Sequence, residues 1–202
     1  LRSYVIKILL NATIPLAVML LSGVFLYDAL QNSLDTGDRI AREQDIIGAA
    51  FGLTTHVLDA ETGERGFAIT GQESFLAPYQ QAISSFELAW KDLAGQVTES
   101  PEQLARLNQV YEIFARWNLE AAQPSIERRR SGEVAPDIPA FVQGKAMVDE
   151  FRAIMQEFIA HANNQLLAIQ QQSVQIAQRA NMIAVAGMGG AVLVALVLWM
   201  TL

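Results

Sequence analysis

The chain has 202 residues and a formal net charge of −7, from 14 Lys and Arg against 21 Asp and Glu, and this length suits one domain. The acidic balance argues against nucleic acid as a partner, because phosphate contacts need clustered Lys and Arg. The sequence contains no cysteine, which excludes a disulfide framework and thiolate metal sites.

Two uncharged apolar segments flank the charged part of the chain. Residues 8–27 and residues 182–202 contain no charged side chain, and each is about long enough to cross a hydrocarbon core as a helix. All of the acidic residues lie between them. We therefore predict three parts. Residues 1–27 hold an N-terminal flank and a first transmembrane helix, residues 28–181 form a water-exposed domain, and residues 182–202 form a second transmembrane helix.

The charges beside the first apolar segment indicate an orientation. Arg2 and Lys7 occur there without a nearby acid, and the positive-inside rule places such a flank in the cytoplasm. Residues 28–181 are therefore expected outside the cytoplasmic membrane, with both termini in the cytoplasm and any output domain just beyond Leu202. A cleaved signal peptide is the alternative for residues 1–27, but the apolar run is too long and no small-x-small site follows it.

The first half of the water-exposed domain predicts two helices. Residues 28–70 hold no proline and repeat apolar residues at helical spacing, so the first membrane helix is expected to continue through them. Gly71 is the expected stop, because glycine readily takes the left-handed conformation that ends helices. Residues 74–97 form the second predicted helix, with a 3-4 spacing typical of a bundle seam. Its seam residues are Leu76, Tyr79, Ile83, Phe86, Trp90, Leu93 and Val97.

Two further helices are predicted in the second half. Ser100 and Gln103 have the spacing of a capping box at the start of the third helix, which ends near residues 131–132. Pro124 is expected to kink it. The fourth helix starts in the proline-containing loop before residue 140 and is expected to run unbroken into the second apolar segment. The predicted fold class is all-α, an antiparallel four-helix bundle whose long first and fourth helices continue into two transmembrane helices.

Two stretches carry a resemblance to a known family. Residues 57–79 read VLDAETGERGFAITGQESFLAPY, and residues 144–152 read GKAMVDEFR. In sequence and order they resemble the third type of CHASE domain, an extracellular sensory module, and the resemblance extends over most of residues 28–181. It implies a bacterial receptor in the inner membrane that senses an unknown periplasmic or extracellular ligand or partner protein.

The resemblance also implies a cytoplasmic output. We expect a sensor histidine kinase of a two-component system, with a diguanylate cyclase or a chemoreceptor as alternatives. A membrane-anchored structural or accessory subunit that docks a partner protein is an alternative of another class. No enzymatic activity is expected within these residues themselves.

The charged residues of the two motifs are the candidate site. At about 1.5 Å of rise per residue, Asp59 lies at nearly the height of Arg152, and Arg65 lies within reach of Asp149. The two motifs are therefore expected to form one polar network between the first and fourth helices. A structural link, a ligand site and unpaired surface charge remain the possible roles. The candidate members are Asp59, Glu61, Arg65, Lys145, Asp149 and Arg152.

The remaining polar residues predict no catalytic, cofactor or metal site. His56 and His161 lie at different expected heights, roughly 44 and 32 Å above the membrane, and therefore do not suit a shared haem. Neither histidine belongs to a Glu-x-x-His pair of the kind a di-iron bundle needs, and we find no convincing Ser-His-acid set. The arginines of residues 128–130 end the third helix, where cations are favourable; an anion-binding patch is the alternative.

The membrane-proximal residues predict self-association. The second and third helices are too short to cover the lowest part of the two long ones, and two isolated helices bury too little apolar surface to hold together in water. We therefore expect a parallel homodimer whose seam includes Leu30, Leu34 and Ile169.

The second apolar segment also contains a packing motif. Its small residues are spaced four apart, which suits close contact between helices in membrane lipid, although glycine is simply common in such helices. They are Ala186, Gly187, Gly190 and Ala191.

Overall fold

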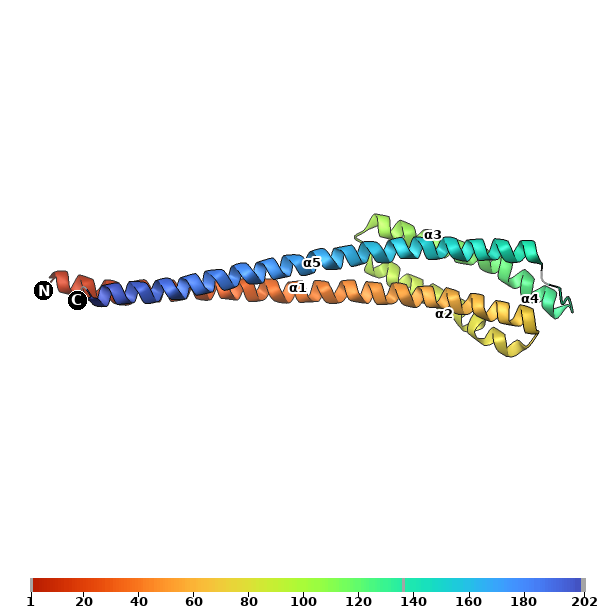
Figure 1. Ribbon diagram of the computed structural model, residues 1–202, viewed down its shortest axis with the longest axis horizontal. Helices are drawn as coiled ribbons and strands as arrows, with labels where there is room; N and C mark the ends of the chain where they lie inside the picture. The colour runs from red at the N-terminus through yellow and green to blue at the C-terminus, as the bar shows by residue number, and fades with distance from the viewer. Residues whose placement is uncertain (1, 136, 201–202) are drawn as a thin grey trace. The chain divides into compact units, whose positions relative to one another are not determined.

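The computed structural model describes residues 2–135 and 137–200, and all regular structure within them is helical (Figure 1). The helix α3 continues through a π-helical segment, η2, into α4, so the described residues form four helices in chain order. The all-α, four-helix fold class predicted from the sequence is confirmed. The elements are α1 (Arg2–Thr70), the 3-10 turn η1 (Glu73–Phe75), α2 (Leu76–Gln96), α3 (Pro101–Trp117), η2 (Asn118–Ala122), α4 (Gln123–Arg130) and α5 (Ile138–Met200).

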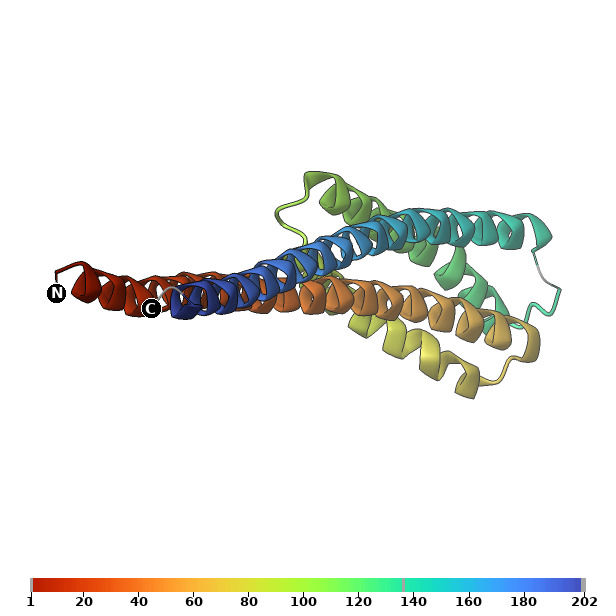
Figure 2. The same cartoon turned by 60° about the vertical axis from the view of Figure 1, so that its left-hand side comes forward.

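The chain divides into two compact units, and α1 and α5 contribute to both. Glu43–Gln165 form the first, called here the bundle unit. Leu1–Arg42 and Leu166–Leu202 form the second, called here the two-helix unit. Within the bundle unit, Figures 1 and 2 show α2, α3 and α4 lying alongside α1 and α5.

The core of the bundle unit is built from apolar side chains of all four helices. Phe86 of α2 packs against Phe114 of α3 with ring centroids 4.1 Å apart, and against Phe151 of α5 at 6.3 Å. Leu53 on α1 and Phe158 on α5 are fully buried in the same cluster. A fully buried side chain of this size contributes about 1.5–3 kcal/mol to stability. The seam predicted for residues 74–97 is therefore part of a common core.

The predicted helix ends are largely correct. α1 stops at Thr70, and Gly71 has φ +70°, the left-handed conformation expected there. α4 stops at Arg130, followed by Gly132 at φ +96°. Asp137 begins α5 by accepting a hydrogen bond from the Ala140 N–H at 3.1 Å. These ends depend on local backbone chemistry, which explains why the sequence indicated them.

The capping box predicted at the start of α3 is wrong. The Ser100 backbone is extended as a cap requires, but its side chain makes no capping hydrogen bond to the described residues. Gln103 turns inward instead, where it is only 3% exposed. Its Nε2 donates to the Phe158 carbonyl of α5 at 3.1 Å, and its side-chain oxygen accepts from Arg106. A buried amide must find partners, and here they lie across the core.

The irregularity expected at Pro124 takes the form of the π-helical segment η2, which ends two residues before it. Proline lacks an N–H, and its ring clashes with the carbonyl four residues earlier in a regular helix. A π-helical turn inserts an extra residue and changes this spacing. The hydroxyl of Tyr79 donates to the Asn118 side chain in η2 at 2.6 Å, which ties the irregular turn to α2.

Within the two-helix unit, α1 and α5 lie side by side (Figures 1 and 2). Among the described residues, one helix is long and apolar enough to cross a membrane, the part of α1 from Leu16 to Thr70. A Cβ atom added at Gly187 of α5 would lie 2.8 Å from Ser22 Oγ of α1, whereas one at Gly190 would have nothing within 4 Å. Of these two predicted packing glycines, Gly187 therefore marks a close helix contact.

Two glycines of the first motif allow the start of α2 to approach α1. A Cβ atom at Gly63 would lie 2.8 Å from the Phe75 carbonyl oxygen and 2.9 Å from the Tyr79 nitrogen. At Gly66 it would lie 2.4 Å from the Phe75 ring. The motif therefore contains glycine where the backbone of η1 and α2 crosses α1, a packing role that spacing along one helix does not reveal.

This contact predicts opposite effects for two identical substitutions on α1. Gly63→Ala should lower the free energy of unfolding by about 1–3 kcal/mol, because the new methyl group meets rigid backbone. Gly52→Ala should raise it by about 0.5–1 kcal/mol, since nothing lies within 4 Å of that position and alanine favours the helix. The near-ultraviolet circular dichroism of the full chain in detergent, followed through unfolding, measures both. Equal shifts of the same sign would contradict this packing.

Candidate functional site

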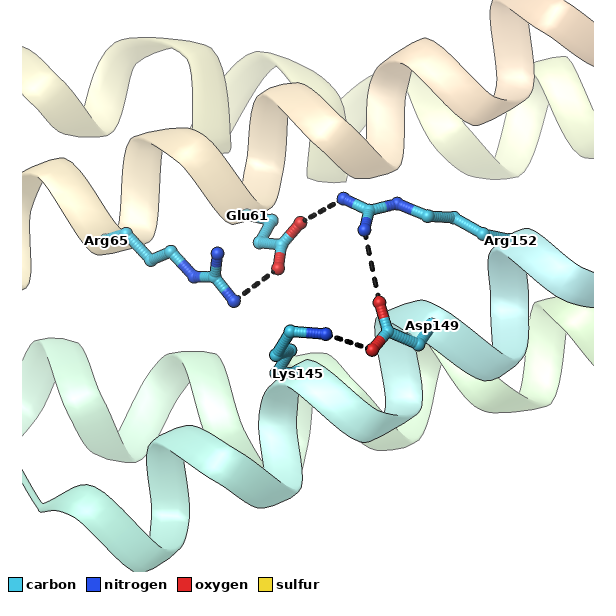
Figure 3. Close-up of polar contacts among 5 residues, drawn as sticks. All are labelled: Glu61, Arg65, Lys145, Asp149 and Arg152. Carbon is cyan, nitrogen blue, oxygen red and sulfur yellow. Dashed lines mark hydrogen bonds and ion pairs between the residues drawn. The ribbon is translucent and has the colours of Figure 1, made fainter.

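Five charged side chains of the two sequence motifs meet between α1 and α5 in the bundle unit (Figure 3). Glu61 on α1 forms an ion pair with Arg65 on its own helix at 2.6 Å. Its other oxygen accepts a hydrogen bond from Arg152 of α5 at 2.8 Å. Arg152 also donates to Asp149 at 3.2 Å, and Lys145 pairs with Asp149. Five predicted residues thus form one continuous chain of charges, called here the polar network.

The pairing within the polar network differs from the one that helix heights predicted. Arg152 binds Glu61 in place of Asp59, which is exposed and has no hydrogen bond or ion pair with another described residue. Arg65 turns toward Glu61 and places its guanidinium 4.7 Å from the centre of the Phe141 ring. Asp149 is therefore held by residues of α5.

The angular positions of the two acids around the axis of α1 explain why Arg152 binds Glu61 and not Asp59. At 100° per residue, Glu61 continues the buried stripe of Leu53 and Val57, whereas Asp59 lies on the other side of α1. Glu61 and Glu64 are accordingly buried, at 4% and 6% exposure of the whole residue. The periodicity of the apolar residues contained this signal, and height along the helix alone missed it.

The electrostatics of the polar network depend on the buried Glu61 carboxylate. A buried charge is costly unless charged hydrogen-bonding partners surround it, and two guanidinium groups meet that requirement here. Arg152 is the partner that connects the helices, and its side chain is partly exposed. The pKa of Asp149 is lowered by its hydrogen bond from Lys145 and by the charges of Lys145, Arg152 and Arg65.

A cavity of about 230 Å³ adjoins the polar network within the bundle unit. Its walls come from α1, the η2 and α4 region, the start of α5 and the loop between α4 and α5. Glu61, Arg65 and Lys145 of the polar network line it, together with the aromatic rings of Trp117 and Phe141. Aromatic walls with a few placed polar groups are typical of small-molecule sites.

Glu64 is a buried acid on the wall of the cavity that sequence reasoning did not select. Burial raises the pKa of Glu64, and the nearby charge of Glu61 adds to this. A hydrogen bond from Ser125 and the charges of Arg65 and Arg128 oppose the shift. The protonated form of this carboxyl is therefore favoured in the folded protein relative to the unfolded chain.

The three arginines that end α4 have separate environments. Arg128 pairs with Asp137, at the start of α5. Arg130 makes a bidentate contact to Glu73 at 2.9 and 2.8 Å. Arg129 lies over Gly71, where an added Cβ atom would be 2.8 Å from its Nη2, and its buried Nε has no hydrogen-bond partner among the described residues.

The comparison with protein families covers both motifs. The family model of the CHASE3 domain matches residues 36–172, which is more than half of the chain and includes both motifs. The chain belongs to the CHASE3 domain family. CHASE3 is an extracellular sensory domain of membrane receptors and is not itself catalytic. No curated protein and no solved structure matches the chain.

The residues predicted for a dimer seam all lie in the two-helix unit. Leu30 and Leu34 precede the matched region, and each is 56% exposed on α1 in the two-helix unit. Ile169, inside the matched region, is 7% exposed. Its side chain is therefore covered within a single chain, in contrast to Leu30 and Leu34 of α1.

The environment of Glu64 in the CHASE3 bundle predicts a pH-dependent stability. As pH rises, the unfolded chain loses its Glu64 proton near the ordinary pKa of 4.5, while the folded chain keeps the proton to a higher pH. The contribution of Glu64 to stability therefore falls between these two pKa values. Glu64→Gln, which cannot ionise, should melt at a higher temperature than the wild type above that window, and the difference should shrink toward pH 4.5.

Thermal melts of the full chain across this pH range measure the effect. Glu112→Gln, at an exposed position of α3, is the matched control for losing a carboxylate from the surface. A difference between Glu64→Gln and the wild type that does not change with pH would contradict the assignment.

Proposed function

We propose that the chain is the extracytoplasmic sensory input and transmembrane signalling portion of a bacterial receptor, a sensor histidine kinase of a two-component system. The observation that carries the proposal is the contact between Glu61 and Arg152. It joins the two CHASE3 motifs and connects α1 to α5. A receptor needs such a connection between its sensory residues and the elements that reach the membrane.

The continuity of the two long helices supports a route for the signal. α1 runs from Arg2 to Thr70 and α5 from Ile138 to Met200, and each holds both a CHASE3 motif and an apolar segment. Packed helices have discrete arrangements, so that small shifts at a sensory site become helix translations or rotations. The signal that we propose is a displacement of α1 relative to α5.

The location of the domain belongs to the same proposal. The uncharged residues 8–27 and 182–202 would cross the bacterial inner membrane, and residues 28–181 would lie in the periplasm or outside the cell. Arg2 and Lys7 support cytoplasmic termini through the positive-inside rule. The codons that follow Leu202 in the gene test the output class. A histidine kinase domain is the expected result, and a short basic tail without signalling motifs would overturn the receptor proposal.

The polar network gives a prediction that separates signalling from stability. Arg152→Ala should lower the free energy of unfolding by about 1.5–3 kcal/mol, the range for a hydrogen bond to a charged group, and should change autophosphorylation of the full-length receptor in membranes. Lys91→Ala, in an exposed ion pair of α2, is the matched control and should change neither. A destabilised Arg152→Ala receptor with unchanged output would show that the link is structural only.

A parallel homodimer is the assembly that we propose for the receptor. Leu30 and Leu34 support it, because both are exposed apolar residues of α1 outside the bundle unit. The sequence has no native cysteine, so single cysteines can be placed without a background. Leu30→Cys and Leu34→Cys should give disulfide-linked dimers when membranes are oxidised.

Two control positions test whether the crosslinking is specific to the predicted seam. Leu88→Cys, at a 74% exposed position of α2, reports random collisions, and Ile169→Cys reports a site already covered within one chain. Neither should crosslink as the α1 positions do. Monomer at Leu30 and Leu34 in folded protein, or equal crosslinking at Leu88, would contradict the seam.

A further inference from the structure

The cavity of the bundle unit touches both helices that carry the CHASE3 motifs. Arg65 and Ala68 of α1 line one side, and Phe141 and Lys145 of α5 line another. The end of α4 closes the cavity with Arg128 and Arg129. A molecule held there would contact α1, α4 and α5 at once. It would be in the right place to act on the link between the two long helices.

The cavity lining carries as many basic as acidic side chains, and two of its arginines keep unused hydrogen-bond donors. Four acids line the cavity: Asp137 pairs with Arg128, Glu61 contacts Arg65 and Arg152 of the polar network, Glu64 is buried in the wall, and Glu133 is exposed. Arg129 keeps a buried Nε without a partner among the described residues. Arg65 presents five N–H donors, and its contact with Glu61 Oε1 at 2.6 Å is an ion pair without hydrogen-bond geometry. A negatively charged hydrogen-bond acceptor would satisfy these unused donors of Arg129 and Arg65.

The buried acid in the wall fits the same charge preference. Glu64 is the remaining buried carboxyl of the lining, and its burial favours the protonated form. A protonated carboxyl donates a hydrogen bond, so it tolerates a bound anion that an ionised carboxylate would repel. Guanidinium groups bind carboxylates with two parallel hydrogen bonds, which gives orientation as well as affinity.

The rest of the lining is apolar and partly aromatic. Trp117 and Phe141 contribute rings, and the small side chains of Ala68 and Ala121 leave the space open. Arg65 is already held against the Phe141 ring at 4.7 Å, so its guanidinium is oriented before any ligand arrives. An apolar body beside an anionic group is the shape of ligand that these walls match.

We propose that this cavity is the ligand site of the domain and that it takes a small organic acid. The carboxylate contacts Arg129 and Arg65, and the apolar body packs against Trp117 and Phe141. The proposal deepens the proposed sensory function and rests on it for its biological meaning. Binding itself is a property of these 202 residues and is measured without any output domain.

The experiment uses matched acid and amide probes on the full chain in lipid nanodiscs. Benzoate, phenylacetate, 3-methylbutanoate and hexanoate are titrated beside the corresponding amides, with acetate as the acid that lacks an apolar body. Isothermal titration calorimetry and the shift of the melting temperature report binding. At least one of the four acids should bind at least ten times more tightly than its amide and than acetate. If none of the four acids binds with a Kd below about 1 mM, which corresponds to about −4 kcal/mol, the proposal is overturned.

Three variants locate the site. Arg129→Gln should weaken binding of the acid at least tenfold, and Ala68→Leu should do the same by filling the cavity while every charge is kept. Arg116→Gln, an arginine of α3 that pairs with Glu150 at 3.6 Å and does not line the cavity, is the matched control and should bind as the wild type does. Near-ultraviolet circular dichroism verifies that each variant is folded. Binding that survives both Arg129→Gln and Ala68→Leu would overturn the assignment to this cavity.

The failure of this proposal is distinguishable from failure of the receptor function. Absence of binding overturns the ligand class while autophosphorylation still depends on Arg152. Binding of an acid by a chain whose gene encodes no signalling domain would instead overturn the receptor proposal and leave the cavity assignment intact. Tighter binding of an amide than of its acid would overturn the assigned charge preference.

Discussion

The buried carboxylate of Glu61 is the constraint on which the rest of the bundle unit depends. A charge in that position is tolerated only when cationic donors surround it, and the two donors come from different helices: Arg65 of α1 and Arg152 of α5. The requirement therefore fixes how α1 and α5 face each other at this level. Apolar contacts alone are less selective, because similar hydrophobic side chains pack acceptably in several arrangements.

The first CHASE3 motif combines several tasks in one short stretch of α1. Gly63 and Gly66 admit the start of α2, and Gly71 both ends the helix and leaves room for the Arg129 guanidinium. Between them, Glu64 and Arg65 line the cavity. Close approach, helix termination and charge placement thus occur within three turns of helix. A substitution that satisfies one of these tasks, such as an added side chain at Gly63, disturbs the packing that positions the others.

Features set by neighbouring residues could be predicted from the sequence, whereas features set by contacts between distant residues could not. The stops at Gly71 and Gly132 and the apolar seam of α2 follow from backbone conformation and periodicity, which neighbouring residues determine. Gln103 failed as a capping residue because its partner, the Phe158 carbonyl, is 55 residues away. The cavity was not predicted at all, since its walls come from four separate segments. The charged motif residues were identified, but their pairing required the rotation of each helix as well as its height.

The position of Arg65 connects the cavity to the link between the helices. Its guanidinium contacts Glu61, the same carboxylate that binds Arg152, and it also lines the cavity beside Phe141. A carboxylate bound at the proposed site would compete with Glu61 for donors of Arg65. Glu61 would then depend more on Arg152, because a buried carboxylate left without a partner is costly. Occupancy of the cavity would thus change the strength of the contact between α1 and α5 without any ligand atom touching it.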